Sequence, residues 1–266
     1  YPATDIHWKF LSRMASQYGW SVTAPLYPLA PENAAAHITS WANDYYAAYR
    51  DEIGHKPFVM GGDSAGGGLT AALAQMARDA AQPLPAALLL ICPWLNLDPA
   101  HPDQLKTEPR DGILTISGIS EGGTLYAGDL PRTDPRCSPI FGNWDGLPSI
   151  LAFAGGDDIL VTDSRALKAK LPSVEVTELS GMMHDWPIFS FSESRKAQAQ
   201  MANDLEALKA ACGINNVAGK IPFICFDLAG GAMCLYARPR LRCKGGIKRD
   251  GTLSRVKGQA WLDHQW

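Results

Sequence analysis

Residues 58–68, with the sequence FVMGGDSAGGG, constrain this chain more than any other stretch. A short apolar run leads into Ser64, which lies between Gly62 and Gly66, and an alanine-rich segment follows. The spacing Gly-x-Ser-x-Gly is typical of a sharp turn from a strand into a helix, where larger side chains would collide with either element. Free N–H groups and the helix dipole at such a turn favour negative charge. The stretch therefore predicts a nucleophilic serine, although a structural glycine-rich turn remains an alternative for the pentapeptide alone.

The order of apolar segments predicts an α/β fold. Residues 84–91 form a continuous apolar run, as expected of a strand buried on both faces of a parallel sheet. We expect a mostly parallel, doubly wound sheet with helices on both faces. The strands are predicted at 21–27, 58–63, 84–91, 149–154 and 174–179, and the helices at 1–18, 34–52, 64–81, 119–127, 163–171 and 193–212.

Three candidate catalytic residues follow three predicted strands. Ser64 follows one strand, Asp158 a later strand and His184 the last, so all three would meet at the carboxyl edge of the sheet. Serine catalysis needs a base, and an acid that orients the base. We prefer Asp158 to Asp157 as the acid, and we interpret Asp163 as the cap of the next helix. Four histidines precede the acid and do not fit this order: His7, His37, His55 and His101.

The composition and charge of the chain limit the kinds of molecule that it is expected to bind. A net charge of −3 spread over 266 residues provides no basic stripe for nucleic acid, and no apolar run is long enough to cross a bilayer. The six cysteines form no C-x-x-C pair, and no histidines accompany them at ligand spacing. We therefore expect a small-molecule substrate, no metal and no cofactor. We favour a cytoplasmic location and leave the oligomeric state open.

Seven short motifs occur in order along the chain: YPLAPE at 27–32, GDSAGG at 62–67, PW at 93–94, SP at 138–139, GLP at 146–148, D-x-L at 158–160 and GM-x-H at 181–184. Together they resemble the hormone-sensitive-lipase-like esterase family, the third α/β-hydrolase fold group. The resemblance covers residues 1 to about 213 and implies a carboxylic ester hydrolase for short- to medium-chain acyl esters, with lactones as a further candidate. It implies Ser64 as nucleophile, His184 as general base and acid, Asp158 as the orienting carboxylate and the Ala65 N–H as an oxyanion donor.

One departure from this family concerns the oxyanion hole. Its members carry a His-Gly-Gly-Gly loop, which supplies further N–H donors, and this motif occurs nowhere in the 266 residues. The strand before that loop lies mid-sheet in the family, between the strands predicted here at 21–27 and 58–63. We therefore expect an N-terminally incomplete fold, the product of a partial gene. The alternative function is a catalytically silent fragment.

Composition shifts after Gly213, so we predict a hydrolase domain at 1–213 and a separate tail at 214–266. Residues 236–266 resemble a piece of a lipocalin-like domain related to carotenoid 1,2-hydratase, because the closing run GQAWLDHQW fits the signature Gly-x-Ala-Trp-x-Asp-His-x-Trp. A fortuitous basic tail is the alternative. If the resemblance holds, the tail could define a hydratase or ligand-binding protein, but we assign Asp263 and His264 no catalytic role.

Overall fold

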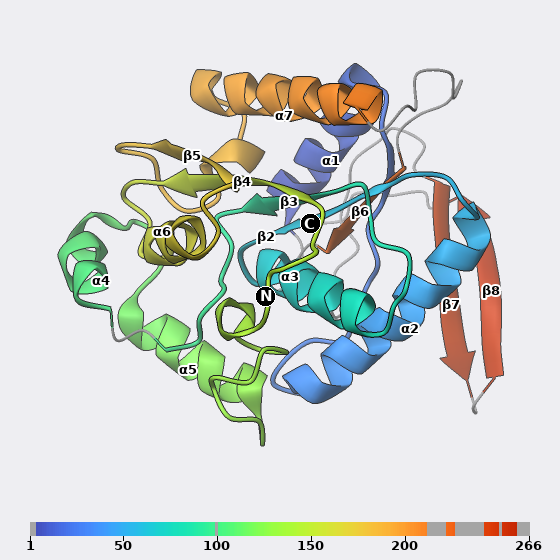
Figure 1. Cartoon of the computed structure of the whole chain (residues 1–266), viewed down its shortest axis with the longest axis horizontal. Coiled ribbons are helices and arrows are strands. Elements are labelled where there is room, and N and C mark those ends of the chain that lie inside the picture. The colour runs from blue at the N-terminus through green and yellow to red at the C-terminus, as the bar shows by residue number, and fades with distance from the viewer. Residues whose placement is uncertain (1–3, 99–100, 212–221, 227–241, 250–251, 260–266) are drawn as a thin grey trace, which may run out of the picture.

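The fold is an open parallel sheet of six strands in the order β1-β6-β2-β3-β4-β5 (Figure 1). The structure is a computed structural model that describes residues 4–98, 101–211, 222–226, 242–249 and 252–259. All neighbouring strands in this sheet run parallel. The strands are β1 (Ser21–Thr23), β2 (Val59–Asp63), β3 (Ala87–Ile91), β4 (Ser149–Gly155), β5 (Glu175–Leu179) and β6 (Pro222–Phe226).

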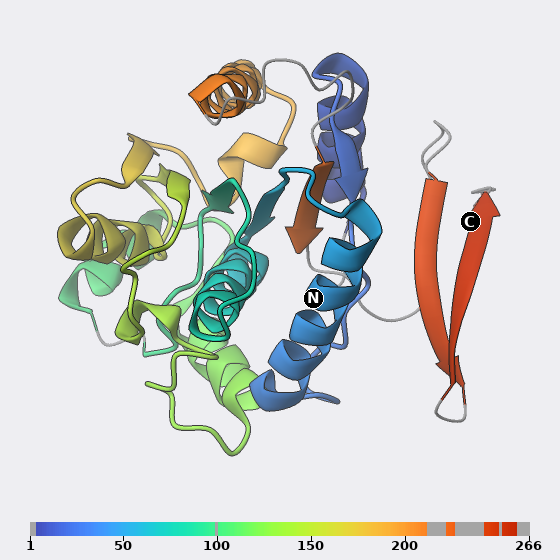
Figure 2. The same cartoon turned by 45° about the vertical axis from the view of Figure 1, so that its right-hand side comes forward.

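Helices cover both faces of the sheet, which confirms the predicted α/β-hydrolase class (Figures 1 and 2). On one face lie α1 (Asp5–Gln17) and α7 (Ser192–Ala211), and on the other lie α2 (Ala35–Ile53), α3 (Ser64–Asp79) and α6 (Val161–Lys170). Between β3 and β4, the chain forms α4 (Pro102–Thr107) and α5 (Ile116–Ala127). The sequence predicted only a shorter version of α5 in that segment.

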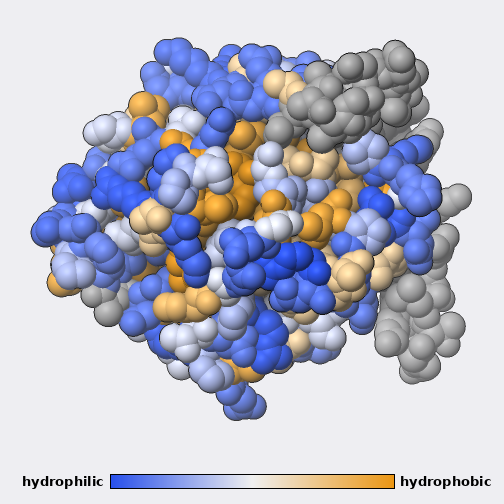
Figure 3. All heavy atoms as spheres, viewed as in Figure 1, coloured by the Kyte–Doolittle hydropathy of each residue, from blue (hydrophilic) through white to orange (hydrophobic). Residues whose placement is uncertain are grey.

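Two hydrophobic layers hold the helices to the sheet, and they follow from strand alternation. Leu88 and Leu90 pack with α2 and α3, whereas the intervening Leu89 and the adjacent Ile91 pack with α1 and α7. Successive side chains of a strand point to opposite faces, so a strand covered on both sides must be apolar throughout. Figure 3 shows hydrophobic side chains gathered in the middle of the molecule, between α7 and α3, within a mainly hydrophilic rim.

Strand β6 occupies the position that we expected to be empty. It comes from beyond residue 213, yet it pairs with β1 through Phe223 and Val22 and with β2 through Phe226 and Gly62. The sheet is therefore continuous from β1 to β5. The division at residue 213 stays a prediction, but one strand beyond it belongs to this sheet.

The predicted strands at 21–27 and 84–91 are shorter in the structure. β1 ends at Thr23, before Pro25, and β3 begins at Ala87, after Pro85. Proline has no N–H to donate to a neighbouring strand, which accounts for both boundaries.

The last described elements form a separate antiparallel pair, β7 (Arg242–Arg249) and β8 (Thr252–Gln259). Most of the lipocalin-like signature, including Asp263 and His264, lies outside the described residues. Among the helices of the described part, none is both long and apolar enough to span a membrane.

Candidate active site

Ser64 lies at the tight junction of β2 and α3. Its backbone φ is +52°, a left-handed value that is uncommon for residues other than glycine. The glycines that follow allow α3 to pack closely on the chain after β3, because a Cβ at Gly68 would overlap the carbonyl oxygen of Trp94. The Trp94 N–H in turn donates to the Ser64 carbonyl oxygen at 2.9 Å. The turn therefore holds the serine hydroxyl, which is half-buried, at the carboxyl edge of the sheet.

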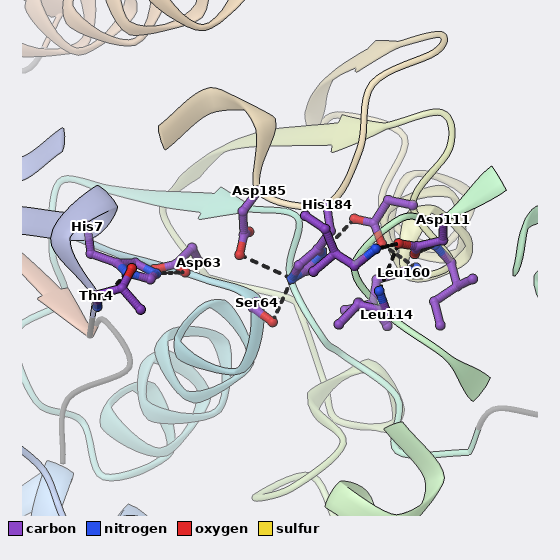
Figure 4. Close-up of polar contacts among 12 residues, drawn as sticks. Thr4, His7, Asp63, Ser64, Asp111, Leu114, Leu160, His184 and Asp185 are labelled. Carbon is purple, nitrogen blue, oxygen red and sulfur yellow. Dashed lines mark hydrogen bonds and ion pairs between the residues drawn. The ribbon is translucent and has the colours of Figure 1, made fainter. Parts of the chain in front are cut away.

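The structure brings Ser64, His184 and Asp158 into one hydrogen-bonded chain (Figure 4). His184 Nε2 lies 2.9 Å from Ser64 Oγ, and His184 Nδ1 lies 2.8 Å from Asp158 Oδ2. His184 and Asp158 are both buried. In this arrangement Nδ1 carries a proton for Asp158, which leaves the Nε2 lone pair to accept the serine proton.

A backbone N–H group holds the Asp158 carboxylate in place. Asp158 Oδ1 accepts the Leu160 N–H at 2.8 Å, so both carboxylate oxygens are engaged. Asp111 accepts the Ile159 N–H at 2.8 Å and the Leu114 N–H at 2.9 Å, and this connects the loop after β4 to the segment before α5. The long segment between β3 and β4 thus supports the loop that carries Asp158.

The other two carboxylates near Asp158 in the sequence, Asp157 and Asp163, bond to groups other than His184. Asp157 forms an ion pair with Arg110, with Oδ1 2.8 Å from Nε. Asp163 lies in the first turn of α6 but does not cap it, so that prediction was wrong. Its Oδ2 instead accepts the N–H groups of Leu95 and Asn96, at 2.7 and 2.9 Å. Burial raises the pKa of Asp163 to about 7.

A second carboxylate lies beside His184 that the sequence analysis did not predict. Asp185 Oδ2 lies 3.1 Å from His184 Nε2, the nitrogen that also faces Ser64. Burial alone would lower the pKa of His184, but the charges of Asp185 and Asp158 outweigh it and hold that pKa well above its usual value. Position alone, directly after the histidine, was the signal that could have indicated Asp185.

His7 and Asp63 form a buried pair next to this centre. His7 Nε2 lies 3.2 Å from Asp63 Oδ2, while Nδ1 accepts the Thr4 N–H at 2.9 Å (Figure 4). His7 therefore presents its Nε2 proton to Asp63. His7 does not fit the chain order Ser, Asp, His expected of the base. It lies on α1 and contacts Asp63, the residue directly before Ser64.

Two groups of side chains in the described part of the chain could each offer three metal-ligand atoms within 4.8 Å. They are Cys92 with His184 and Asp185, and His7 with Asp63 and Asp185. In both groups the histidine nitrogens are already hydrogen-bonded, and the Thr4 N–H holds His7 in the tautomer whose Nε2 is protonated. A protonated nitrogen cannot bind a metal. We therefore interpret both groups as the polar surroundings of Ser64 and His184.

Ala65 follows Ser64 at the N-terminus of α3, where N–H groups have no acceptor within the helix. The Ala65 N–H is the group that the sequence predicts as an oxyanion donor, and this role stays a prediction. β6 ends at Phe226, which pairs with Gly62 two residues before Ser64, so its carboxyl end lies at the same sheet edge.

Comparison with known proteins agrees with this geometry. A family model described as alpha/beta hydrolase fold matches residues 2–188. The chain is 35% identical over 192 residues to an acetyl-hydrolase of Streptomyces hygroscopicus, covering 68% of this chain and 62% of that protein. It is 29% identical over 206 residues to an esterase of Acinetobacter venetianus, covering 74% and 68%. The chain thus spans about two thirds of the length of these relatives.

Solved structures give the same result. A hormone-sensitive lipase from a metagenome library superposes with a TM-score of 0.65 at 27% identity, covering 68% of this chain and 64% of that one. EstE5, in crystals soaked with p-nitrophenyl butyrate, superposes with a TM-score of 0.64 at 30% identity, covering 69% and 64%. The chain therefore belongs to the alpha/beta hydrolase fold family and is, within it, similar to the hormone-sensitive-lipase-like esterases.

Proposed function

We propose that this chain is a serine carboxylesterase that hydrolyses short- to medium-chain acyl esters through an acyl-enzyme on Ser64, with lactones as a further candidate substrate. The observation that carries the proposal is the continuous contact from Ser64 Oγ to His184 Nε2 at 2.9 Å and from His184 Nδ1 to Asp158 at 2.8 Å. The names of the relatives, esterase and acetyl-hydrolase, support small acyl groups.

Acylation begins when Ser64 Oγ attacks the ester carbonyl carbon and its proton moves to His184 Nε2. The carbonyl π electrons move to oxygen, and the resulting oxyanion accepts the Ala65 N–H. Asp158 keeps Nδ1–H in place and stabilises the imidazolium without itself taking the proton. The intermediate then expels the alcohol oxygen, which takes the proton from Nε2, and the acyl group stays on Ser64.

Deacylation repeats these steps with water. Nε2 removes one proton from water as the water oxygen attacks the acyl carbon. The second intermediate expels Ser64 Oγ, which takes the proton back, and the carboxylic acid leaves. One ester and one water become one acid and one alcohol, with no cofactor required.

A catalytically silent fragment is the alternative, and specific observations favour considering it. The chain spans about two thirds of its relatives' length and has no His-Gly-Gly-Gly run. Loss of one oxyanion donor typically reduces kcat by about 10²–10³. The alternative therefore predicts an intact triad with little turnover.

A fluorophosphonate probe separates the two functions, because it reacts only with an activated serine. The adduct is mapped by peptide mass spectrometry in the native chain and in the Ser64→Ala variant, together with hydrolysis of 4-nitrophenyl esters of increasing acyl length. The proposal expects labelling confined to Ser64 and ester hydrolysis that the variant loses. A folded native chain that is not labelled would contradict the proposed esterase.

A further inference from the structure

Asp185 is held beside His184 by a strained backbone. Its φ is +55° and ψ is 22°, in the left-handed region, and its C=O accepts the Ile188 N–H at 3.0 Å. Aspartate tolerates this region better than most residues with a side chain. The turn directs Oδ2 back to His184 Nε2, 3.1 Å away, on the side of the ring that faces Ser64 (Figure 4).

The Asp185 carboxylate is buried, and only one of its oxygens is bonded. Its Oδ1 has no hydrogen-bond partner among the described residues, and the side chain is largely removed from solvent. Burial raises the pKa of Asp185 to about 6, against the opposite effect of His184. An ionised carboxylate in this place therefore depends on a positive partner, and His184 is the group in contact with it.

Asp63 adds a second negative charge on the same side. It raises the pKa of Asp185 by repulsion, and His7 in turn donates to Asp63 from α1. His7, Asp63, Asp185 and His184 thus form a row in which the two carboxylates lie between the two histidines, and the row ends at Ser64 (Figure 4).

The remaining titratable groups around His184 come from the ends of β3 and β4. Asp158 contacts Nδ1, and its charge also acts on Asp163, in the first turn of α6. Cys92, directly after β3, is fully buried, and burial raises its pKa well above the usual value, so its thiol stays protonated. Asp158 and Asp185 are therefore the charges in direct contact with the ring.

These contacts stabilise protonated His184 more than neutral His184. Neutral His184 points the Nε2 lone pair at Ser64, and that lone pair also faces the lone pairs of Asp185 Oδ2. Protonated His184 donates from Nε2 and satisfies Asp185. We propose that Asp185 is a positioning residue that stabilises the protonated form of His184 beside Ser64 and so sets the lower pH limit of ester hydrolysis, an inference that rests on the proposed function.

Two variants remove the carboxylate without disturbing the turn. Asp185→Asn and Asp185→Gly both suit a positive φ. The matched control is Asp157→Asn, which removes a negative charge from the neighbouring loop, where Asp157 contacts Arg110 and not His184.

The first measurement follows the His184 ring nitrogens by NMR in chains labelled with ¹⁵N-histidine, with the signal assigned by its loss in His184→Gln. We expect His184 to lose its proton at a lower pH in both Asp185 variants than in the native chain, by about one pH unit or more. Asp157→Asn should titrate like the native chain. Because no turnover is needed, this result stands even if the esterase proposal fails. An unchanged His184 titration in a folded Asp185 variant overturns the inference.

The second measurement is the pH profile of kcat/KM for a 4-nitrophenyl ester. At acid pH, where kcat/KM falls with pH, we divide the kcat/KM of each protein by its own maximum. This fraction should be about tenfold larger for the Asp185 variants than for the native chain. A purely structural role would lower the plateau and leave the acid limb in place, which would contradict the inference. Ester hydrolysis that persists in Ser64→Ala would instead contradict the proposed function. In that case the NMR titration of His184 alone decides the inference about Asp185.

Discussion

Phe226 pairs with Gly62 in the sheet, so a strand from near the end of the chain lies directly beside the strand that leads into Ser64. The same strand pairs on its other side with β1, which has no other neighbour among the described strands. Removing β6 would expose backbone N–H and C=O groups on both β1 and β2.

We therefore predict that a chain ending at residue 213 loses cooperative unfolding, whereas one ending at residue 241 keeps it. The longer chain retains β6 and, of the described elements, loses the separate β7–β8 pair. Circular dichroism and thermal melts of both chains measure the difference. Equal cooperativity in the two would show that β6 does not contribute to the stability of the sheet.

Asp158→Asn should lower kcat for ester hydrolysis by about 10⁴. An asparagine amide would donate to His184 Nδ1, so the proton would move to Nε2 and the ring could no longer accept from Ser64. Asp157→Asn should stay within about threefold of the native rate, because Asp157 pairs with Arg110. Kinetics of both variants test the choice between these adjacent residues, and a larger effect at Asp157 would reverse it.

Gly68→Ala should destabilise the fold by about 1–3 kcal/mol, because the added Cβ would overlap the backbone of Trp94. The displaced Trp94 N–H also bonds the Ser64 carbonyl, so activity should fall as well. Gly112→Ala is the control, since its Cβ would meet nothing within 4 Å and its φ is not positive. Urea unfolding of the two variants measures the contrast, and equal stabilities would argue against close packing at Gly68.

Asp163→Asn should change how stability depends on pH. The pKa of Asp163 is raised to about 7 in the folded chain from an ordinary value of 3.8, so between these values the folded state holds a proton that the unfolded state releases. Stability therefore falls as pH rises through this window, and asparagine removes that contribution. The free energy of unfolding of the variant should improve relative to the native chain from pH 4 to pH 7. Parallel pH curves for the two chains would contradict this.

Much of the fold could be predicted because it depends on local patterns. The apolar run at 84–91 indicated a strand covered on both faces, and Leu88 to Ile91 do alternate between the two hydrophobic layers. The helix predicted at 1–18 is present as α1, which ends at Gln17 just before Gly19 at φ +72°. Such features require only the preferences of neighbouring residues.

The candidate site was predictable to the extent that topology implies it. In a parallel sheet, residues that follow successive strands gather at one edge, so chain order alone places Ser64, Asp158 and His184 near one another. Asp163 was misjudged because a carboxylate in the first turn of a helix ordinarily bonds to that helix, whereas here the chain after β3 passes close enough to donate to it instead.

The sequence by itself determined the hydrolase class, the strand-to-helix turn at Ser64 and the order of the three candidate catalytic residues. Each of these features depends only on the spacing of nearby residues or on their order along the chain. Only the tertiary structure decided that β6 lies between β1 and β2, that His7 contacts Asp63, and that Asp185 shares His184 Nε2 with Ser64. These contacts join segments distant in the chain or depend on one backbone angle, and burial then determines their electrostatics. No local pattern of residues specifies that combination.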